Sequence, residues 1–126
     1  MTSAVTIRPA RHDDVPAVVA MVHELAEFER AADQCHLTEE QLRTALCGPD
    51  PSVFAHVAAD ADEVPVGFAL WYVNFSTWEG THGVHLEDLY VRPAARGTGT
   101  GAALLAALAA ICVERGYRRL EWVMLD

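Results

Sequence analysis

The segment from Gly99 to Arg115 carries the strongest helical pattern of the chain, and its neighbours restrict how the chain can fold. Apolar residues recur in it at helical spacing, and Gly116 follows as the residue type that commonly ends a helix. Strand-like segments lie on both sides of it, at 82–91 and 119–125. A strand, a helix and a strand in this order form a crossover connection, in which the helix packs on the sheet that contains both strands. We therefore expect a layered α/β protein.

The first half of the chain contains two further helical patterns. Asp13 is a suitable N-cap, Pro16 fits the first turn, and apolar residues continue at helical spacing to about Arg30. Residues 38–41 read Thr-Glu-Glu-Gln, which is a capping box, and they begin a second helix that Gly48 stops. Two helices are therefore expected before the central strands.

The remaining apolar segments predict a mainly antiparallel sheet. Residues 5–8 form a short strand, and the segments 53–59 and 64–74 are rich in Val, Phe, Trp and Tyr. The turn residues 60–63 between these segments indicate a hairpin. The predicted order is β-α-α-β-β-β-α-β within one domain, because 126 residues suit a single domain.

The chain is acidic, and its charge is unevenly distributed. The formal net charge is −9, all nine bases are Arg, and residues 1–63 carry twelve acids against four Arg. An acidic half attracts cations and argues against nucleic acid as a partner. The alternative is that the acidic residues only keep exposed helix faces solvated.

Nothing in the sequence predicts a membrane segment or a secretory signal. The longest apolar run, 102–113, is too short to span a bilayer, and residues 1–8 lack a basic start and an apolar stretch. We expect a cytoplasmic protein that does not bind membranes.

The cysteines and histidines do not form a recognisable metal motif. Cys35, Cys47 and Cys112 are odd in number and widely spaced, which favours neither a disulfide framework nor a zinc site. His82 and His85 are three residues apart on a strand and should point to opposite faces. No bound metal is expected.

Residues 91–101, Val-Arg-Pro-Ala-Ala-Arg-Gly-Thr-Gly-Thr-Gly, connect a predicted strand to a predicted helix. Glycine lets the backbone approach a ligand, and the first N–H groups of a helix have no partner within it. Together with the helix dipole and with Arg96, these features predict a phosphate site. The alternative is that the glycines only allow a tight turn between the strand and the helix, without a ligand. One glycine would suffice for such a turn.

Two nucleotide-binding motifs fit this loop poorly. A P-loop requires Gly-Lys-Ser/Thr, and the chain contains no Lys. Gly97, Gly99 and Ala102 match a dinucleotide fingerprint, with Glu121 on the next strand, but the loop contains Pro93 and is longer than a Rossmann turn.

The segment Arg96-Gly97-Thr98-Gly99-Thr100-Gly101 resembles the acetyl-CoA loop of the GNAT N-acetyltransferases, which reads Arg/Gln-x-x-Gly-x-Gly/Ala. Further matches look like the diamine (spermidine/spermine) acetyltransferase branch and extend over essentially the whole chain. They are Ile7-Arg8-Pro9-Ala10, Glu24-Leu25-Ala26-Glu27-Phe28-Glu29, Leu37-Thr38-Glu39, Gly67-Phe68-Ala69, Trp78-Glu79-Gly80 and Leu86-Glu87-Asp88-Leu89-Tyr90-Val91. The resemblance implies a GNAT acyl-CoA N-acyltransferase fold with a splayed sheet flanked by helices.

The resemblance also implies a function and the residues that perform it. The chain would transfer an acetyl group directly from acetyl-CoA to a primary amine of a small cationic substrate, such as a polyamine or diamine. Glu87 would take the proton of the attacking ammonium, directly or through water. In a strand Glu87 and Asp88 alternate, so at most one of them points inward. The acetyl-CoA residues would be Leu89, Tyr90 and Val91 along the pantetheine, and Arg96, Gly97, Thr98, Gly99, Thr100, Gly101 and Ala102 around the pyrophosphate. The substrate residues would be Phe28, Glu29, Trp78, Asp88, Glu121, Trp122 and Val123.

One departure from the family pattern concerns the end of the chain. After the strand near residue 125, GNAT enzymes continue with a Tyr-bearing helix and two strands, so residues 1–126 resemble a shortened single domain. The resemblance further implies a homodimer. The alternative is a non-catalytic CoA-binding or self-associating remnant.

Overall fold

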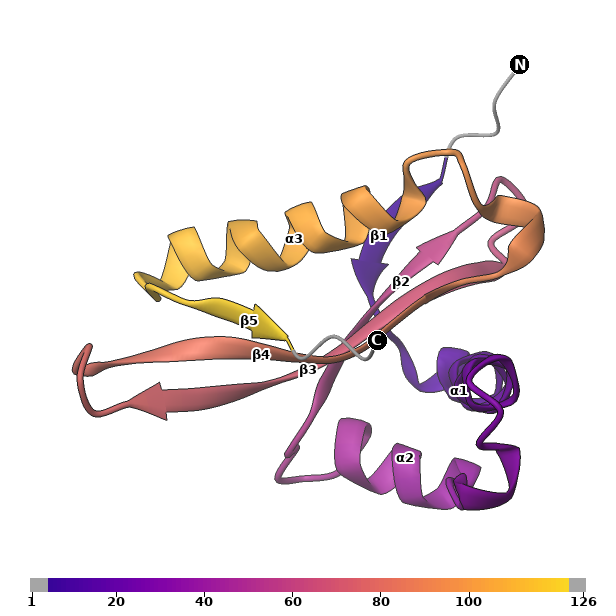
Figure 1. Ribbon diagram of the computed structural model, residues 1–126, viewed down its shortest axis with the longest axis horizontal. Helices are drawn as coiled ribbons and strands as arrows, with labels where there is room; N and C mark the ends of the chain where they lie inside the picture. The colour runs from indigo at the N-terminus through magenta and orange to yellow at the C-terminus, as the bar shows by residue number, and fades with distance from the viewer. Residues whose placement is uncertain (1–4, 123–126) are drawn as a thin grey trace.

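Five strands form one sheet in the order β1-β2-β3-β4-β5 (Figure 1). The structure is a computed structural model that describes residues 5–122. The strands are β1 (Thr6–Pro9), β2 (Phe54–Ala59), β3 (Pro65–Ser76), β4 (Thr81–Val91) and β5 (Leu120–Trp122). Neighbouring strands are antiparallel except β4 and β5, which are parallel because α3 (Thr100–Arg115) connects them as a crossover. The predicted α/β class, central hairpin and single crossover are confirmed.

Helices cover both faces of the sheet. The helices α1 (Val15–Phe28) and α2 (Glu39–Cys47) lie on one face, and α3 lies on the other (Figure 1). Three short 3-10 turns are η1 (His12–Asp14), η2 (Ala32–Gln34) and η3 (Pro93–Ala95). Each face has its own apolar core. The core under α1 includes Val15, Val18, Met21, Val57, Phe68 and Tyr90, and the core under α3 includes Trp71, Val84, Leu86, Leu104, Leu108 and Cys112.

The start of α1 differs from the sequence prediction. The N-cap is Asp14 rather than Asp13, because 12–14 form a 3-10 turn that displaces the helix start by one residue. The buried Asp14 carboxylate does not cap the helix, but accepts hydrogen bonds from Arg8 at 2.6 and 3.2 Å and from the Arg11 N–H at 2.7 Å. Burial raises the pKa of Asp14, but these hydrogen bonds outweigh it and hold the pKa below its ordinary value. This ion pair ties β1 to the start of α1.

The other predicted helix ends are confirmed. The Thr38 hydroxyl accepts from the Gln41 N–H at 3.2 Å, and the Gln41 side chain accepts from the Thr38 N–H at 3.0 Å. Gly116 ends α3 in a left-handed conformation, with φ of 72°. Within residues 5–122, no helix is long and apolar enough to cross a membrane.

A β-bulge interrupts the pairing of β3 with β4. Leu70 pairs with Asp88 and Trp71 pairs with Leu86, so Glu87 is the extra residue on β4. A bulge bends the strand and changes the direction of the side chains that follow it. Bulges of this kind are common beside active sites, and this one lies at the residue that the resemblance assigns as the proton acceptor.

The bulge decides which face the end of β4 presents. Side chains alternate along a strand, so one extra residue moves all later ones to the opposite face. Leu86 packs in the core under α3, whereas Tyr90 packs in the core under α1. Asp88 pairs with Leu70, which belongs to the α1 side, and is half-buried, while Glu87 is exposed. As expected, no more than one of the two carboxylates points inward.

A polar network connects β5 to the rest of the sheet. Asn74 on β3 donates to Glu121 on β5, and Glu121 also pairs with Arg119 at 2.9 Å and lies 3.7 Å from His85. Hydrogen bonds from Asn74, Arg119 and His85 outweigh the opposing effect of burial and lower the pKa of Glu121. Gly83 makes this approach possible, because a Cβ there would lie 2.9 Å from the Arg119 carbonyl oxygen and 3.0 Å from the Asn74 side chain.

Candidate active site

The end of α1 and the bulged part of β4 bring three carboxylates together. Burial, then the charges of Glu87 and Glu29, raise the pKa of Asp88 to about 6. Glu29 follows the last residue of α1, and Asp88 lies directly after the bulge. The site therefore concentrates negative charge, and at neutral pH it holds an ionised Asp88 for which a bound cation is favourable.

Aromatic rings and an arginine border these carboxylates. The Arg96 guanidinium lies 5.2 Å from the centre of the Phe28 ring and 5.5 Å from that of the Tyr90 ring. Its Nε donates to the Val91 carbonyl oxygen at 2.8 Å. Phe28 is 69% exposed, so this ring remains open to solvent although it is apolar. Aromatic faces that hold a guanidinium also suit an organic ammonium.

Glu24 belongs to this region, and the sequence analysis did not assign it a role. Its carboxylate accepts from the Tyr90 hydroxyl at 3.0 Å and from Arg92 Nε at 3.3 Å. Burial, and then the contact with Glu24, raise the pKa of Tyr90. The sequence feature that could have pointed to Glu24 is its position one turn before Phe28, which places both side chains on one face of α1.

The glycine loop before α3 is open, and two of its glycines adopt a left-handed backbone conformation. Gly97 and Gly99 have positive φ angles of 78° and 81°, which favour glycine, and a Cβ at either would meet nothing within 4 Å. Gly99 is the N-cap of α3 and provides no side chain to satisfy the first N–H groups. The Thr98 hydroxyl instead donates to the Ala95 carbonyl oxygen at 2.6 Å, which shapes the loop. An open loop, an uncapped helix and the neighbouring Arg96 could together hold a phosphate group.

Of the other residues assigned to the substrate site, the structure describes Trp78, Glu121 and Trp122. Trp78 is 98% exposed at the turn between β3 and β4, and Glu121 is engaged in the polar network of β5. Trp122 pairs in register with Leu86 and is half-exposed, while Val123 falls outside the described residues. The expected splaying of the strands beyond Trp122 falls outside them as well. These four assignments stay predictions.

The histidines behave as expected. His85 lies against the Tyr72 ring and Glu121, whereas His82 lies against Phe75 and Tyr117 on the other face of β4. Across residues 5–122 there is no group of three His, Cys, Asp or Glu side chains that could hold a metal ion.

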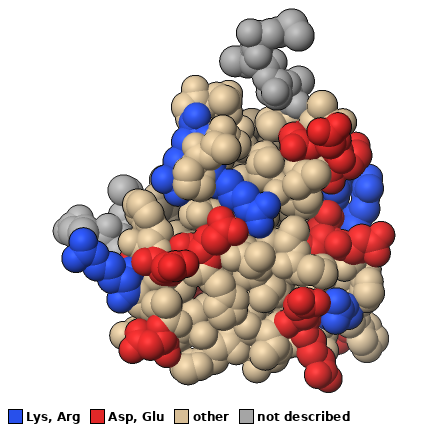
Figure 2. Space-filling view, turned by 90° about the vertical axis from the view of Figure 1, so that its right-hand side faces the viewer, with Lys and Arg blue, Asp and Glu red and all other residues tan. Residues whose placement is uncertain are grey.

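Acidic and arginine side chains are interspersed on the face that carries the end of α1 and the turn after β4. Figure 2 shows this face, with acidic groups spread over most of it and arginines between them.

Comparison with known proteins assigns the chain to a family. Residues 18–126 match the profile of the acetyltransferase (GNAT) family. The chain belongs to the GNAT family. It is 35% identical to a thialysine N-epsilon-acetyltransferase of Bos taurus, covering 97% of this chain and 75% of that protein, and 38% identical to one of Caenorhabditis elegans, covering 97% and 72%. A spermidine/spermine N(1)-acetyltransferase-like protein of Homo sapiens is 33% identical, covering 85% of this chain and 16% of its own length.

Solved structures support the same assignment. An integron cassette protein from the metagenome of a Cole Harbour salt marsh is 28% identical, covers 94% of this chain and 76% of its own, and superposes with a TM-score of 0.77. A metagenomic aminoglycoside acetyltransferase superposes with a TM-score of 0.79 at 17% identity, covering 97% and 78%, and so shares the fold. The predicted GNAT fold and acetyltransferase class are confirmed. GNAT acetyltransferases use acetyl-CoA as their acetyl donor.

Proposed function

We propose that this GNAT enzyme acetylates a primary amine of a small, cationic substrate, such as a polyamine, a diamine or a thialysine-like amino acid. The observation that carries the proposal is the half-buried Asp88, which feels the charges of Glu87 and of Glu29, the residue that follows the exposed Phe28. Carboxylates and aromatic faces together favour an organic ammonium over a neutral or anionic molecule. The relatives that act on thialysine and on spermidine or spermine fit this substrate class.

Acetyl-CoA supplies the reactive thioester, and the chain supplies its binding site. We assign the pyrophosphate to the loop from Arg96 to Ala102, where the first N–H groups of α3 have no side-chain cap. The backbone of Leu89, Tyr90 and Val91 would hold the pantetheine as an added strand. The Val91 carbonyl oxygen already accepts a hydrogen bond from the Arg96 side chain, so a pantetheine that pairs there would share or displace this contact.

Only the neutral amine is a nucleophile, so a base must remove one proton from the ammonium. We assign this role to Glu87, which the bulge leaves exposed beside the site, acting directly or through one water. Asp88 would bind and orient the cation by charge. Its raised pKa means that it becomes ionised near pH 6 and is charged at neutral pH.

The proposed substrate class can be tested by measuring thiol release from acetyl-CoA across an amine panel. Spermidine, 1,4-diaminobutane and thialysine should be acetylated with a higher kcat/KM than a singly charged alkylamine of similar length. Equal kcat/KM for the whole panel would contradict the assignment of Asp88 and Glu29 to substrate binding.

A matched pair of variants tests the loop assignment. Gly99→Asp places a charge at the N-terminus of α3, where the pyrophosphate would lie, and should weaken CoA binding by about a hundredfold or more. Gly116→Asp places the same side chain at the other end of α3, with a similar φ of 72° and equally open space. Calorimetric titration with CoA should find the affinity of Gly116→Asp unchanged. Equal affinities of the two variants would refute the loop assignment.

The exposed hairpin between β3 and β4 supports a homodimer. Seven residues separate Asp88 from the start of β4, a distance of about 23 Å along a strand, so Trp78 cannot reach the carboxylates of its own subunit. Trp78 can line a substrate site only if a second copy supplies it. Sedimentation of the purified chain should find a dimer, and mixing a Trp78→Ala chain with a Glu87→Gln chain should change the activity if sites are shared.

We also propose a cytoplasmic location. The three cysteines are free and range from buried to exposed, which suits a reducing compartment.

A further inference from the structure

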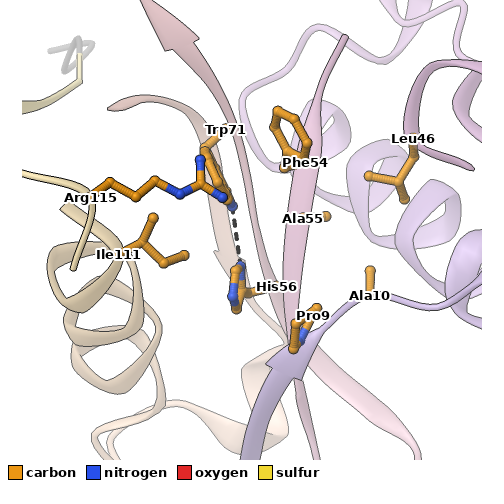
Figure 3. Close-up of a pocket in the computed structure, with 9 residues that line it drawn as sticks. All are labelled: Pro9, Ala10, Leu46, Phe54, Ala55, His56, Trp71, Ile111 and Arg115. Atoms are coloured by element: carbon orange, nitrogen blue, oxygen red, sulfur yellow. Dashed lines mark hydrogen bonds between the residues drawn. The ribbon is translucent and has the colours of Figure 1, made fainter. Parts of the chain in front are cut away.

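A pocket lies at the opposite end of α3 from the glycine loop (Figure 3). It has a volume of about 320 Å³ and opens between the end of β1, the start of β2, β3 and the last turns of α3. A helix of 16 residues is about 24 Å long, so the pocket is remote from the proposed CoA loop. Neither the acetyl donor nor the amine site accounts for it.

Aromatic and aliphatic side chains form the walls of this pocket. The Phe54 and Trp71 rings stack with centres 4.8 Å apart, and Ile111 of α3 faces them across the pocket (Figure 3). Trp71 is only 2% exposed, so the half-buried Phe54 and Ile111 provide the apolar surface that remains open to a ligand.

His56 contributes a hydrogen-bond donor to the wall. This side chain is only 9% exposed, and its Nδ1 accepts from the Trp71 indole N–H at 3.1 Å (Figure 3). An indole nitrogen can only donate, so Nδ1 carries no proton and Nε2 carries it. Burial lowers the pKa of His56, which keeps the ring neutral in this form. No hydrogen bond within residues 5–122 engages Nε2, and this atom is not fully shielded from solvent, so its N–H can donate to an acceptor in the pocket.

Arg115 adds a positive charge to the same pocket. Its guanidinium lies 5.9 Å from the centre of the Trp71 ring. The centre of the His56 ring also lies 5.9 Å from the centre of the Trp71 ring. None of the ion pairs in the described part of the chain includes Arg115. The lining contains no Asp or Glu, so its polar side chains are donors without an acceptor.

We propose that this pocket binds a small organic carboxylate with one flat, apolar ring. The carboxylate would accept from His56 Nε2–H and pair with Arg115, while the ring lies between the half-buried Phe54 and Ile111. The volume is at the lower end for ligand pockets, which suits a single-ring acid and not a nucleotide. The net charge of the chain is negative, but at physiological salt charges act over only about 8 Å, so Arg115 dominates locally.

The test uses phenylacetate as the probe and benzyl alcohol as its uncharged analogue. In ¹⁵N NMR spectra of the whole chain, the indole N–H signal of Trp71 should shift saturably with phenylacetate, and the signal of the remote Trp78 should not. Benzyl alcohol should bind about tenfold more weakly or not at all.

Two arginine variants separate a specific site from unspecific association. Arg115→Gln should weaken phenylacetate binding by about tenfold or more, because it removes the cation from an exposed position without changing the core. Arg118→Gln is the matched control, three residues further along and also exposed, and should bind as the unchanged chain does. An excess of CoA should leave the phenylacetate affinity unchanged.

Three results would overturn the proposal. They are a Trp71 signal that does not move at millimolar phenylacetate, equal affinities of Arg115→Gln and Arg118→Gln, and displacement of phenylacetate by CoA. The last result would place the acid in the acetyl-donor site instead.

Discussion

Asp88 shows how the surroundings of one side chain give it a chemical role. The bulge at Glu87 turns Asp88 toward α1, where burial and two nearby carboxylates make its ionisation unfavourable. This cost becomes a gain when a cationic substrate binds, because the ammonium neutralises the carboxylate. A carboxylate whose ionised form is unfavourable, as that of Asp88 is, is therefore expected at a site proposed to bind a cation.

The cost of ionising Asp88 predicts how stability depends on pH. The pKa of Asp88 is raised from 3.8 to about 6, so the folded state favours the protonated acid, and its contribution to stability is lost as the pH rises from about 4 to about 6. Relative to Asp88→Asn, the unchanged chain should lose about 1 kcal/mol over that range, allowing for solvent screening. Urea unfolding of both chains between pH 4 and pH 8 measures this. A difference in unfolding free energy that does not vary with pH would show that Asp88 titrates normally.

Glu87 is predicted to act in the reaction and not in the fold. Glu87→Gln keeps the size of the side chain but cannot accept a proton, so kcat/KM near neutral pH should fall by about a hundredfold while CoA affinity is preserved. Glu114→Gln, an exposed carboxylate on α3, is the control and should retain full activity. A decrease in kcat/KM of less than about threefold would show that water, and not Glu87, removes the proton from the ammonium.

The attachment of β5 to the sheet depends on few but specific contacts. β5 pairs with β4 through three residues only within the described chain, and the network around Glu121 adds side-chain contacts across three strands. Close approach at Gly83 allows this network to form.

Substitution of Gly83 should therefore weaken the attachment of β5. In Gly83→Ala the added methyl would lie 2.9 Å from a backbone oxygen that cannot move easily, so the free energy of unfolding should fall by about 1–3 kcal/mol. Gly101→Ala is the control, because its methyl would lie 3.9 Å from the nearest atom and alanine favours the helix. Urea denaturation of both variants compares them, and equal stabilities would show that β5 is not held in this way.

At the scale of the whole molecule, the acidic net charge should guide the cationic substrate. The charge of −9 attracts a polyamine from a distance, and salt screens this attraction. Between about 0.02 M and about 0.5 M NaCl the KM for spermidine should rise by about fivefold, with kcat little changed. Steady-state kinetics at several salt concentrations measure the effect, with a singly charged amine as the weaker control. A KM that does not depend on salt would show that the net charge does not attract the substrate and that only direct contacts recognise it.

The sequence by itself determined the parts of this protein that depend on local chemistry. The capping box at Thr38, the end of α3 at Gly116 and the open loop at Gly97 and Gly99 were predicted because their conformations follow from adjacent residues. The family resemblance extended this to the GNAT fold, which the comparisons confirm.

The pairs of residues around the proposed substrate site follow from long-range contacts and not from local sequence. The contact of Phe28 with Arg96 and the partnership of Glu24 with Tyr90 join segments more than sixty residues apart, and no local pattern specifies such pairs. The bulge at Glu87 is decided in the same way, by how β4 pairs with β3. Because side chains alternate with a period of two, that single extra residue determines which face of the sheet Asp88 occupies.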